Sequence, residues 1–189
     1  ALALRLQTGM AELGPAYGAI LMDPPWRFET WPAKGRGRSP KYNTHGPASI
    51  LNIVGGLPAA DDCALFLWAI DPLLPQAFDL FRLLGFKYKT VAFTWAKTGK
   101  TPGVFPIGTG YWARANPEMC LLGTRGKPQR QSKAVRQLII APRREHSRKP
   151  DEIYSRIERL VDGPYLEMFG RQKWPGWDQW GNEVEKFNV

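Results

Sequence analysis

The chain has 189 residues, 43% of them hydrophobic, and a formal charge of +9 at neutral pH. This composition excludes a disordered tail, and the length suits one domain with its own core, which we expect to span residues 1–189. Each apolar run is shorter than the roughly 18 residues that a membrane span needs. Ala1–Met10 also lacks the long apolar stretch of a signal peptide, so we expect a cytoplasmic protein without membrane association.

Short apolar runs alternate with helical patterns along the chain. This order predicts an α/β fold whose mostly parallel sheet is covered by helices on both faces. Arg27–Gly46 and Lys97–Arg114 show neither pattern, and loops of that length in a compact domain are usually functional or disordered. The predicted strands are Ala19–Met22, Ala64–Ile70, Tyr88–Trp95, Met119–Leu122 and Tyr165–Phe169, and the predicted helices are Leu73–Leu84 and Pro150–Val161.

The two cysteines, Cys63 and Cys120, each lie inside an apolar run. Such positions predict buried thiols in a reducing compartment rather than a disulfide. The spacing of two cysteines and two histidines does not form a zinc pattern. We therefore predict no metal site.

The excess of basic residues predicts a polyanionic partner. Positive charge is concentrated in Lys34–Lys41, which contains no acid, and in Arg125–Lys149, whose single acid is Glu145. Either stretch alone could be a solvated loop, but together they indicate phosphate contact, and we expect both to border the active site. The candidates for nucleic-acid contact are Lys34, Arg36, Arg38, Lys41, Tyr42, Arg125, Lys127, Arg130 and Lys133.

The tetrapeptide Asp23-Pro24-Pro25-Trp26 follows the first predicted strand directly. Ligands of open α/β sheets bind at the carboxyl ends of strands, so this turn is a candidate catalytic site. The carboxylate and a proline carbonyl could accept both hydrogens of an aromatic amine such as adenine N6, which would localise its lone pair. The prolines stiffen the turn, and Trp26 could stack on an extruded base. From these four residues alone, a capping Asp23 and a core Trp26 are an equally good interpretation.

Further segments in the same order strengthen the functional interpretation. They are CALFLW from Cys63, TWAK from Thr94, GTGYW from Gly108, EMCLLG from Glu118, RKPDEIYSRIERL from Arg148, LEMFGR from Leu166 and WDQWGNE from Trp177. With the tetrapeptide, they resemble the β-class adenine-N6 methyltransferases, whose eukaryotic members write N6-methyladenosine in messenger RNA. The resemblance runs from about Tyr17 to Glu183.

The resemblance implies a Rossmann-like methyltransferase fold in permuted order, with the catalytic strand before the cofactor strand. It implies S-adenosylmethionine as methyl donor and nucleic acid as partner, and it favours a homodimer. It places Asp23, Pro24, Pro25 and Trp26 in the catalytic turn. The cofactor site is implied at Asp23, Pro25, Lys149, Glu167, Phe169, Arg171, Asn182 and Glu183. Lys149 at a helix start suits the cofactor carboxylate, and Asn182 and Glu183 suit its ribose hydroxyls.

The nature of the substrate is left open by the sequence. The chain is compact and carries no appended RNA-binding segment, which favours DNA over RNA. A catalytically silent partner subunit is a further alternative, although such members usually lose the catalytic turn or the cofactor residues. A plain basic binding module would need neither Asp23 nor Asn182. No general base is required before attack, so His45 and His146 receive no catalytic role.

Overall fold

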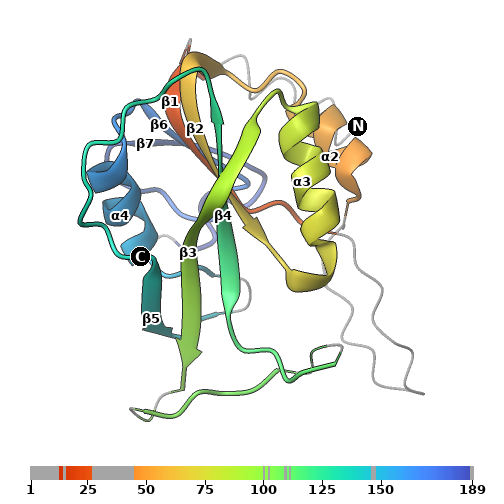
Figure 1. Cartoon of the computed structure of the whole chain (residues 1–189), viewed down its shortest axis with the longest axis vertical. Helices are drawn as coiled ribbons and strands as arrows, with labels where there is room; N and C mark the ends of the chain where they lie inside the picture. Colours follow the sequence, from red (N-terminus) through yellow and green to blue (C-terminus); the bar gives the residue numbers. More distant parts are fainter. Residues whose placement is uncertain are drawn as a thin grey trace.

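The computed structural model describes residues 13–14, 16–26, 45–99, 101, 103–108, 110, 112–145 and 148–187. Its centre is a seven-stranded sheet in the order β5-β3-β4-β2-β1-β6-β7 (Figure 1). The strands are β1 (Tyr17–Met22), β2 (Ala59–Ala69), β3 (Lys87–Thr98), β4 (Glu118–Arg125), β5 (Leu138–Pro142), β6 (Tyr165–Met168) and β7 (Trp177–Trp180). The helices are α2 (Pro47–Val54), the 3-10 turn η1 (Asp71–Leu73), α3 (Leu74–Leu83) and α4 (Glu152–Leu160).

Most neighbouring strands run parallel. β1 is parallel to β2 and β6, β6 is parallel to β7, and β3 is parallel to β5. Only β4 among these strands runs against its neighbours, β2 and β3. The mostly parallel α/β sheet of a Rossmann-like fold is therefore confirmed, and β1 precedes β6 in the chain as the permuted order requires.

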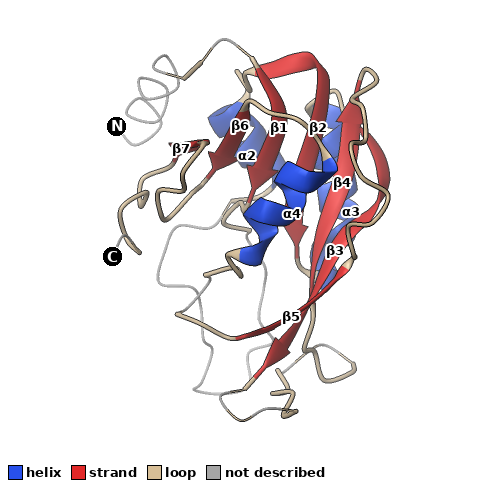
Figure 2. Cartoon of the chain, turned by 90° about the vertical axis from the view of Figure 1, so that its left-hand side faces the viewer, coloured by secondary structure: helices blue, strands red, loops and turns tan. Residues whose placement is uncertain are grey.

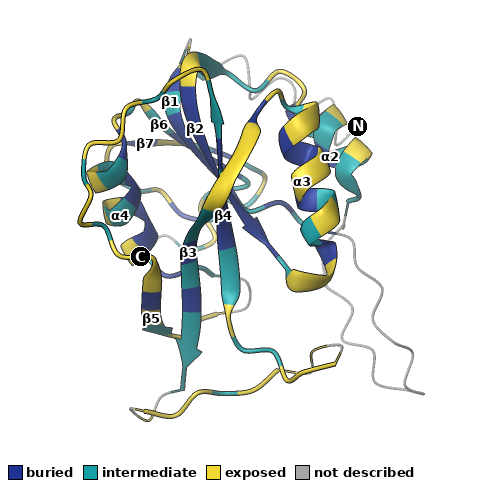
Figure 3. Ribbon diagram, viewed as in Figure 1, coloured by how far each residue is buried: buried dark blue, intermediate teal, exposed yellow. Residues whose placement is uncertain are grey.

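Helices cover both faces of the sheet, with α2 and α3 on one side and α4 on the other (Figure 2). Alternate side chains of β1 consequently enter different cores: Ile20 packs with α2 and α3, and Leu21 packs with α4. Burial on both faces explains why the central strands read as continuous apolar runs (Figure 3).

The carboxyl ends of β1, β2 and β6 meet at one edge of the sheet. Met22 pairs with Leu67 on one side and with Met168 on the other, and Met119 near the start of β4 pairs with Ala69. This is the lower edge in Figure 1, toward which the arrowhead of β3 points. Residues that follow these strands are neighbours in space although they lie far apart in sequence.

Two predictions from composition can be followed in the structure. Cys63 and Cys120 are buried free thiols, as predicted. Burial raises the pKa of Cys63 to about 12 and that of Cys120 well above its ordinary value, so both stay protonated. Across the described residues, no helix is long and apolar enough to cross a membrane.

Candidate active site

The turn after β1 is held in place through its backbone. The Asp23 N–H donates to the Met168 carbonyl over 3.4 Å, which keeps the turn beside the end of β6. The Pro24 carbonyl accepts a hydrogen bond from the Trp26 N–H at 2.8 Å, and the Pro25 carbonyl accepts one from His45 at 2.8 Å. A carbonyl oxygen has two lone pairs, so each proline retains acceptor capacity for a further donor.

Trp26 has a different role from the stacking surface that the tetrapeptide suggested. Its side chain is 6% exposed, and its indole N–H donates to the Trp68 carbonyl at 2.9 Å. A ring buried in this way cannot present a face to an extruded base, so the structure favours the core alternative for Trp26. Trp26 instead anchors the turn to the end of β2.

Four charged side chains of alternating sign meet at this edge. The Lys149 Nζ lies 2.8 Å from Asp23 Oδ2 and 3.3 Å from Glu118 Oε2, and the other Glu118 oxygen lies 2.6 Å from Lys97 Nζ. The four residues come from the ends of β1, β3 and β4 and from the segment before α4. The sequence interpretation assigned roles to Asp23 and Lys149 but none to Glu118 or Lys97.

The charges of this group stabilise one another. Burial alone would raise the pKa of the Glu118 carboxyl, but Lys149 and Lys97 outweigh it and lower the pKa to about 2. Burial would lower the pKa of Lys149, but Asp23 and Glu118 hold it above its ordinary value. Glu118 and Lys149 are consequently both charged at neutral pH.

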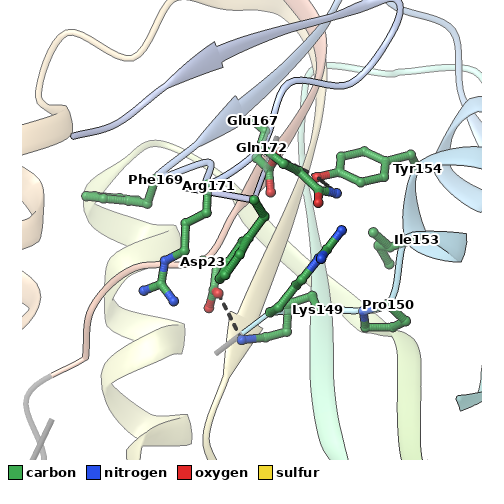
Figure 4. Close-up of a pocket in the computed structure, with 11 residues that line it drawn as sticks. Asp23, Lys149, Pro150, Ile153, Tyr154, Glu167, Phe169, Arg171 and Gln172 are labelled. Carbon is green, nitrogen blue, oxygen red and sulfur yellow. Dashed lines mark hydrogen bonds and ion pairs between the residues drawn. The ribbon is translucent and has the colours of Figure 1, made fainter. Parts of the chain in front are cut away.

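A pocket of about 360 Å³, continuous with solvent, opens beside Asp23 and Lys149 (Figure 4). Five residues predicted to contact the cofactor line it together: Asp23, Lys149, Glu167, Phe169 and Arg171. The lining residues without a predicted cofactor role are Arg148, Pro150, Ile153, Tyr154, Gln172 and Phe187. The pocket thus combines cations, carboxylates and apolar surface.

Two further predicted cofactor residues, Asn182 and Glu183, lie in the turn that follows β7. Glu183 forms an ion pair with Arg171 at 3.3 Å, and the Phe187 N–H donates to the Arg171 carbonyl, so the C-terminal turn borders the pocket through Arg171. Asn182 precedes Glu183 in this turn and is exposed. Their contact with the ribose stays a prediction.

The backbone after β6 adopts an uncommon conformation. Phe169 has a φ of 63°, in the left-handed region that costs a non-glycine residue about 1–2 kcal/mol. The next residue, Gly170, approaches its neighbours closely, because a Cβ there would lie 2.1 Å from the side-chain oxygen of Gln179. Strain of this kind clusters at binding sites. Here the residue in the left-handed conformation, Phe169, forms part of the pocket wall.

Glu167 is a buried carboxyl at the back of the pocket, and it accepts a hydrogen bond from the Tyr154 hydroxyl at 2.8 Å. Burial raises the pKa of Glu167 to about 7, with a further contribution from Asp23, despite the hydrogen bond from Tyr154. The Gln172 amide donates to Asp151 at 2.9 Å and contacts the Tyr154 hydroxyl at 3.4 Å. Tyr154 and Gln172 were missed in the sequence because neither residue type is distinctive inside an amphipathic helix or a loop.

Replacing Glu167 by Gln should flatten the pH dependence of stability in the cofactor-free protein. A carboxyl whose pKa rises from 4.5 to about 7 on folding binds more protons when folded, so its contribution to stability is lost as the pH rises through that window. The Gln variant does not titrate there. Unfolding free energies at pH 5 and pH 8 test this, with the exposed Glu185→Gln as control. Equal pH dependence in Glu167→Gln and wild type would contradict the assignment.

The predicted nucleic-acid residues fall into two groups. Lys34, Arg36, Arg38, Lys41 and Tyr42 lie outside the described residues. Trp26, the last residue of the catalytic turn, forms a bridge with His45, the first described residue after this group.

The second group consists of Arg125, Lys127, Arg130 and Lys133, and its first three members lie away from the site. Arg125 donates to the carbonyls of Ala59 and Ala60 at the start of β2, and Arg130 bridges to Val161, which directly follows α4. Both positions lie at the edge of the sheet opposite Asp23, and Lys127 binds Asp62 there through its backbone. The expectation that this stretch borders the active site is therefore wrong for Arg125, Lys127 and Arg130. Arg125 serves to fasten β4 to β2.

The chain is similar to known proteins over most of its length. A model of the MT-A70 family matches residues 17–183. The type II methyltransferase M.MunI of a Mycoplasma species is 30% identical over 188 residues, which cover 89% of this chain and 78% of that protein. The N(6)-adenosine-methyltransferase catalytic subunit METTL3 of Homo sapiens is 31% identical over 178 residues, which cover 92% of this chain and 29% of that protein.

The MT-A70-like N(6)-adenosine-methyltransferase of Drosophila melanogaster is 30% identical over 175 residues, or 27% of its length. The chain thus spans most of the Mycoplasma relative and less than a third of the two animal relatives. The family match covers β1 through the Gly181-Asn182-Glu183 turn, including the residues that meet at the carboxyl edge of the sheet. On this evidence, the chain belongs to the MT-A70 family.

Proposed function

We propose that this chain transfers a methyl group from S-adenosylmethionine to the N6 amine of adenine in nucleic acid, with DNA as the substrate. The observation that carries the proposal is that Asp23, in a rigid proline turn, pairs with Lys149 and lines an open pocket together with it. Family membership and the names of the relatives, which include N(6)-adenosine-methyltransferases, support the same reaction.

The turn suits the chemistry of an aromatic amine. The lone pair of adenine N6 is delocalised into the ring, which makes the amine a poor nucleophile. Asp23 and a proline carbonyl of the turn are acceptors for its two hydrogens, and accepting both favours a localised lone pair. As N6 attacks, positive charge develops on it and strengthens its attraction to the Asp23 carboxylate. An interaction that grows toward the transition state accelerates the reaction.

The chemical groups that line the pocket match those of the methyl donor. S-adenosylmethionine supplies a methyl group activated by a sulfonium, together with a carboxylate, an ammonium, ribose hydroxyls and an adenine ring. Lys149 would bind the carboxylate, Asp23 the ammonium, and Glu183 with Asn182 the hydroxyls. Arg148 contributes a buried Nε that has no hydrogen-bond partner among the described residues, and Phe169 and Ile153 provide apolar surface.

DNA is the substrate that the comparisons favour. The similarity to the type II methyltransferase extends over 78% of that protein, whereas it covers 27% and 29% of the two animal adenosine methyltransferases. The test is a competition in which the enzyme receives an equimolar mixture of an adenine-containing DNA duplex and an RNA of the same sequence. We expect methylation mainly of the DNA. Preferential methylation of the RNA would overturn the choice of DNA and leave the N6 reaction standing.

Neutralising basic residues of the sequence between Trp26 and His45 should weaken DNA binding. Removing one phosphate-binding cation lowers the slope of log affinity against log salt by about 0.9 for duplex DNA. We therefore expect Arg36→Gln with Arg38→Gln to reduce both affinity and slope. The matched control is Lys127→Gln with Arg130→Gln, which removes the same charge at the opposite edge. Fluorescence anisotropy across a salt series measures both, and equal losses in the two double variants would refute the placement of DNA at the site.

A further inference from the structure

Lys97 and Glu118 form an ion pair that is connected to Asp23 through Lys149. One Glu118 oxygen contacts Lys97 at 2.6 Å and the other contacts Lys149 at 3.3 Å, while Lys149 contacts Asp23 at 2.8 Å. Side-chain exposure of the four residues lies between 17% and 24%. At that exposure their attraction is screened much less than that of an ordinary surface pair.

The position of Lys97 is itself fixed by its backbone. The Lys97 N–H donates to Asn116 Oδ1 at 3.0 Å, and the Asn116 amide donates back to the Lys97 carbonyl at 2.9 Å. The same amide donates to the Pro106 carbonyl at 2.6 Å, so the loop between β3 and β4 is fastened to this point. The backbone of Lys97 is therefore fixed at this point, and its ammonium meets Glu118 at 2.6 Å.

We propose that Lys97 and Glu118 are positioning residues that hold the Lys149 ammonium between Asp23 and the carboxylate of the methyl donor. The inference rests on the proposed function, because it gives Lys149 a donor to bind. Without Glu118, Asp23 is the remaining carboxylate paired with Lys149, and the ammonium moves toward it. Without Lys97, both Glu118 oxygens are available to Lys149, and the ammonium moves away from Asp23. Either displacement misplaces the charge that the donor carboxylate must meet.

The first measurement is the affinity for S-adenosylhomocysteine, a non-reactive probe, by calorimetry. We expect Lys97→Met and Glu118→Gln each to weaken binding by roughly tenfold, as for the loss of a hydrogen bond to a charged group. Lys97→Arg, which keeps the charge, should restore most of the affinity. The control is Arg82→Gln, which breaks an exposed ion pair with Asp79 on α3 and should leave the affinity unchanged. Thermal melting identifies any variant that is not folded.

The second measurement separates positioning from a direct role of Lys97 in DNA binding. If Lys97 acts through Glu118, the Lys97→Met/Glu118→Gln double variant binds the probe no more weakly than Glu118→Gln alone, and the KM for DNA is unchanged in Lys97→Met. If Lys97 instead contacts a DNA phosphate, Lys97→Met raises the KM for DNA and leaves the affinity for the probe unchanged, which would overturn the inference.

The outcome for the wild type distinguishes the two proposals. A wild-type protein that methylates DNA, with Lys97→Met binding the probe as tightly as wild type, would overturn the positioning role alone. A folded wild type that neither binds the probe nor methylates adenine would overturn the proposed function, and the positioning role with it.

Discussion

Asp23→Asn should reduce the single-turnover rate of methyl transfer at least about 10²-fold, as expected for the loss of one preorganised electrostatic group. The Asn side chain keeps one acceptor oxygen and the shape of the residue, but it removes the charge that attracts N6 as positive charge develops. It also removes the counterion that Lys149 meets at 2.8 Å. The measurement is a quench-flow assay on an adenine-containing duplex at saturating S-adenosylmethionine. The affinity for S-adenosylhomocysteine should change less than the rate.

The alternative role for Asp23 is that of a loop cap. Asn caps as well as Asp, so a cap predicts a folded variant with a rate close to that of wild type. In the structure, the Asp23 carboxylate contacts a lysine side chain, which favours the electrostatic role. Asp79→Asn, an exposed change on α3, serves as the control. A folded Asp23→Asn enzyme that works at the wild-type rate would exclude the proposed mechanism.

Lys149→Met should abolish tight binding of the methyl donor and also destabilise the protein. The substitution removes the cation that would meet the donor carboxylate, and it leaves Asp23 and Glu118 without their shared counterion. Loss of a hydrogen bond to a charged group lowers affinity by roughly tenfold or more. Without Lys149, the pKa of Glu118 should rise from about 2 toward its ordinary value, so the variant should lose less stability than wild type as the solution is acidified, and the two proteins should differ most in stability near neutral pH.

Calorimetry with S-adenosylhomocysteine and melting curves from pH 3 to pH 8 measure both effects of Lys149→Met. Lys173→Met is the matched control, because Lys173 is 66% exposed and pairs with Glu185 at the surface. Unchanged affinity in a folded Lys149→Met protein would show that the donor carboxylate binds elsewhere. Unchanged affinity in the control, together with a loss in Lys149→Met, would assign the effect to the site.

Strong periodic patterns predicted the central elements of the fold. The strands at Ala19–Met22 and Tyr165–Phe169 and the helix at Pro150–Val161 correspond to β1, β6 and α4. Three elements, α2, β5 and β7, were not predicted. β7 is four residues long, with a polar centre between its two tryptophans, and β5 buries chiefly Ile139. Neither strand has an alternation long enough to be distinguished from a loop.

The sequence predicted those residues of the candidate site that lie in distinctive motifs. Asp23, Lys149 and Glu167 were named from the motifs, and they line one pocket. The pairing of Glu118 with Lys149 could not be read from the sequence, because it depends on the registration of β4 beside β2. Glu118 begins β4 and Lys149 precedes α4, and the two become neighbours only when the chain folds.

Side-chain burial was the other source of error. Trp26 faces the core rather than the site because its indole N–H meets the Trp68 carbonyl. Arg125 belongs to a basic stretch in sequence, but its guanidinium is bound by backbone carbonyls at the far edge of the sheet. Composition records how much charge a segment carries, whereas the fold decides which of those charges face a ligand.

The position of the transferred methyl group distinguishes adenine-N6 methylation from every other outcome. The protein is incubated with S-adenosylmethionine carrying a deuterated methyl group and with an adenine-containing DNA duplex. The DNA is then digested to nucleosides, and the products are identified by mass spectrometry against standards. We predict deuterated N6-methyladenine with wild type and at least about 10²-fold less with Asp23→Asn over the same time. Label on cytosine, on another adenine nitrogen or on no base at all would contradict the proposed reaction.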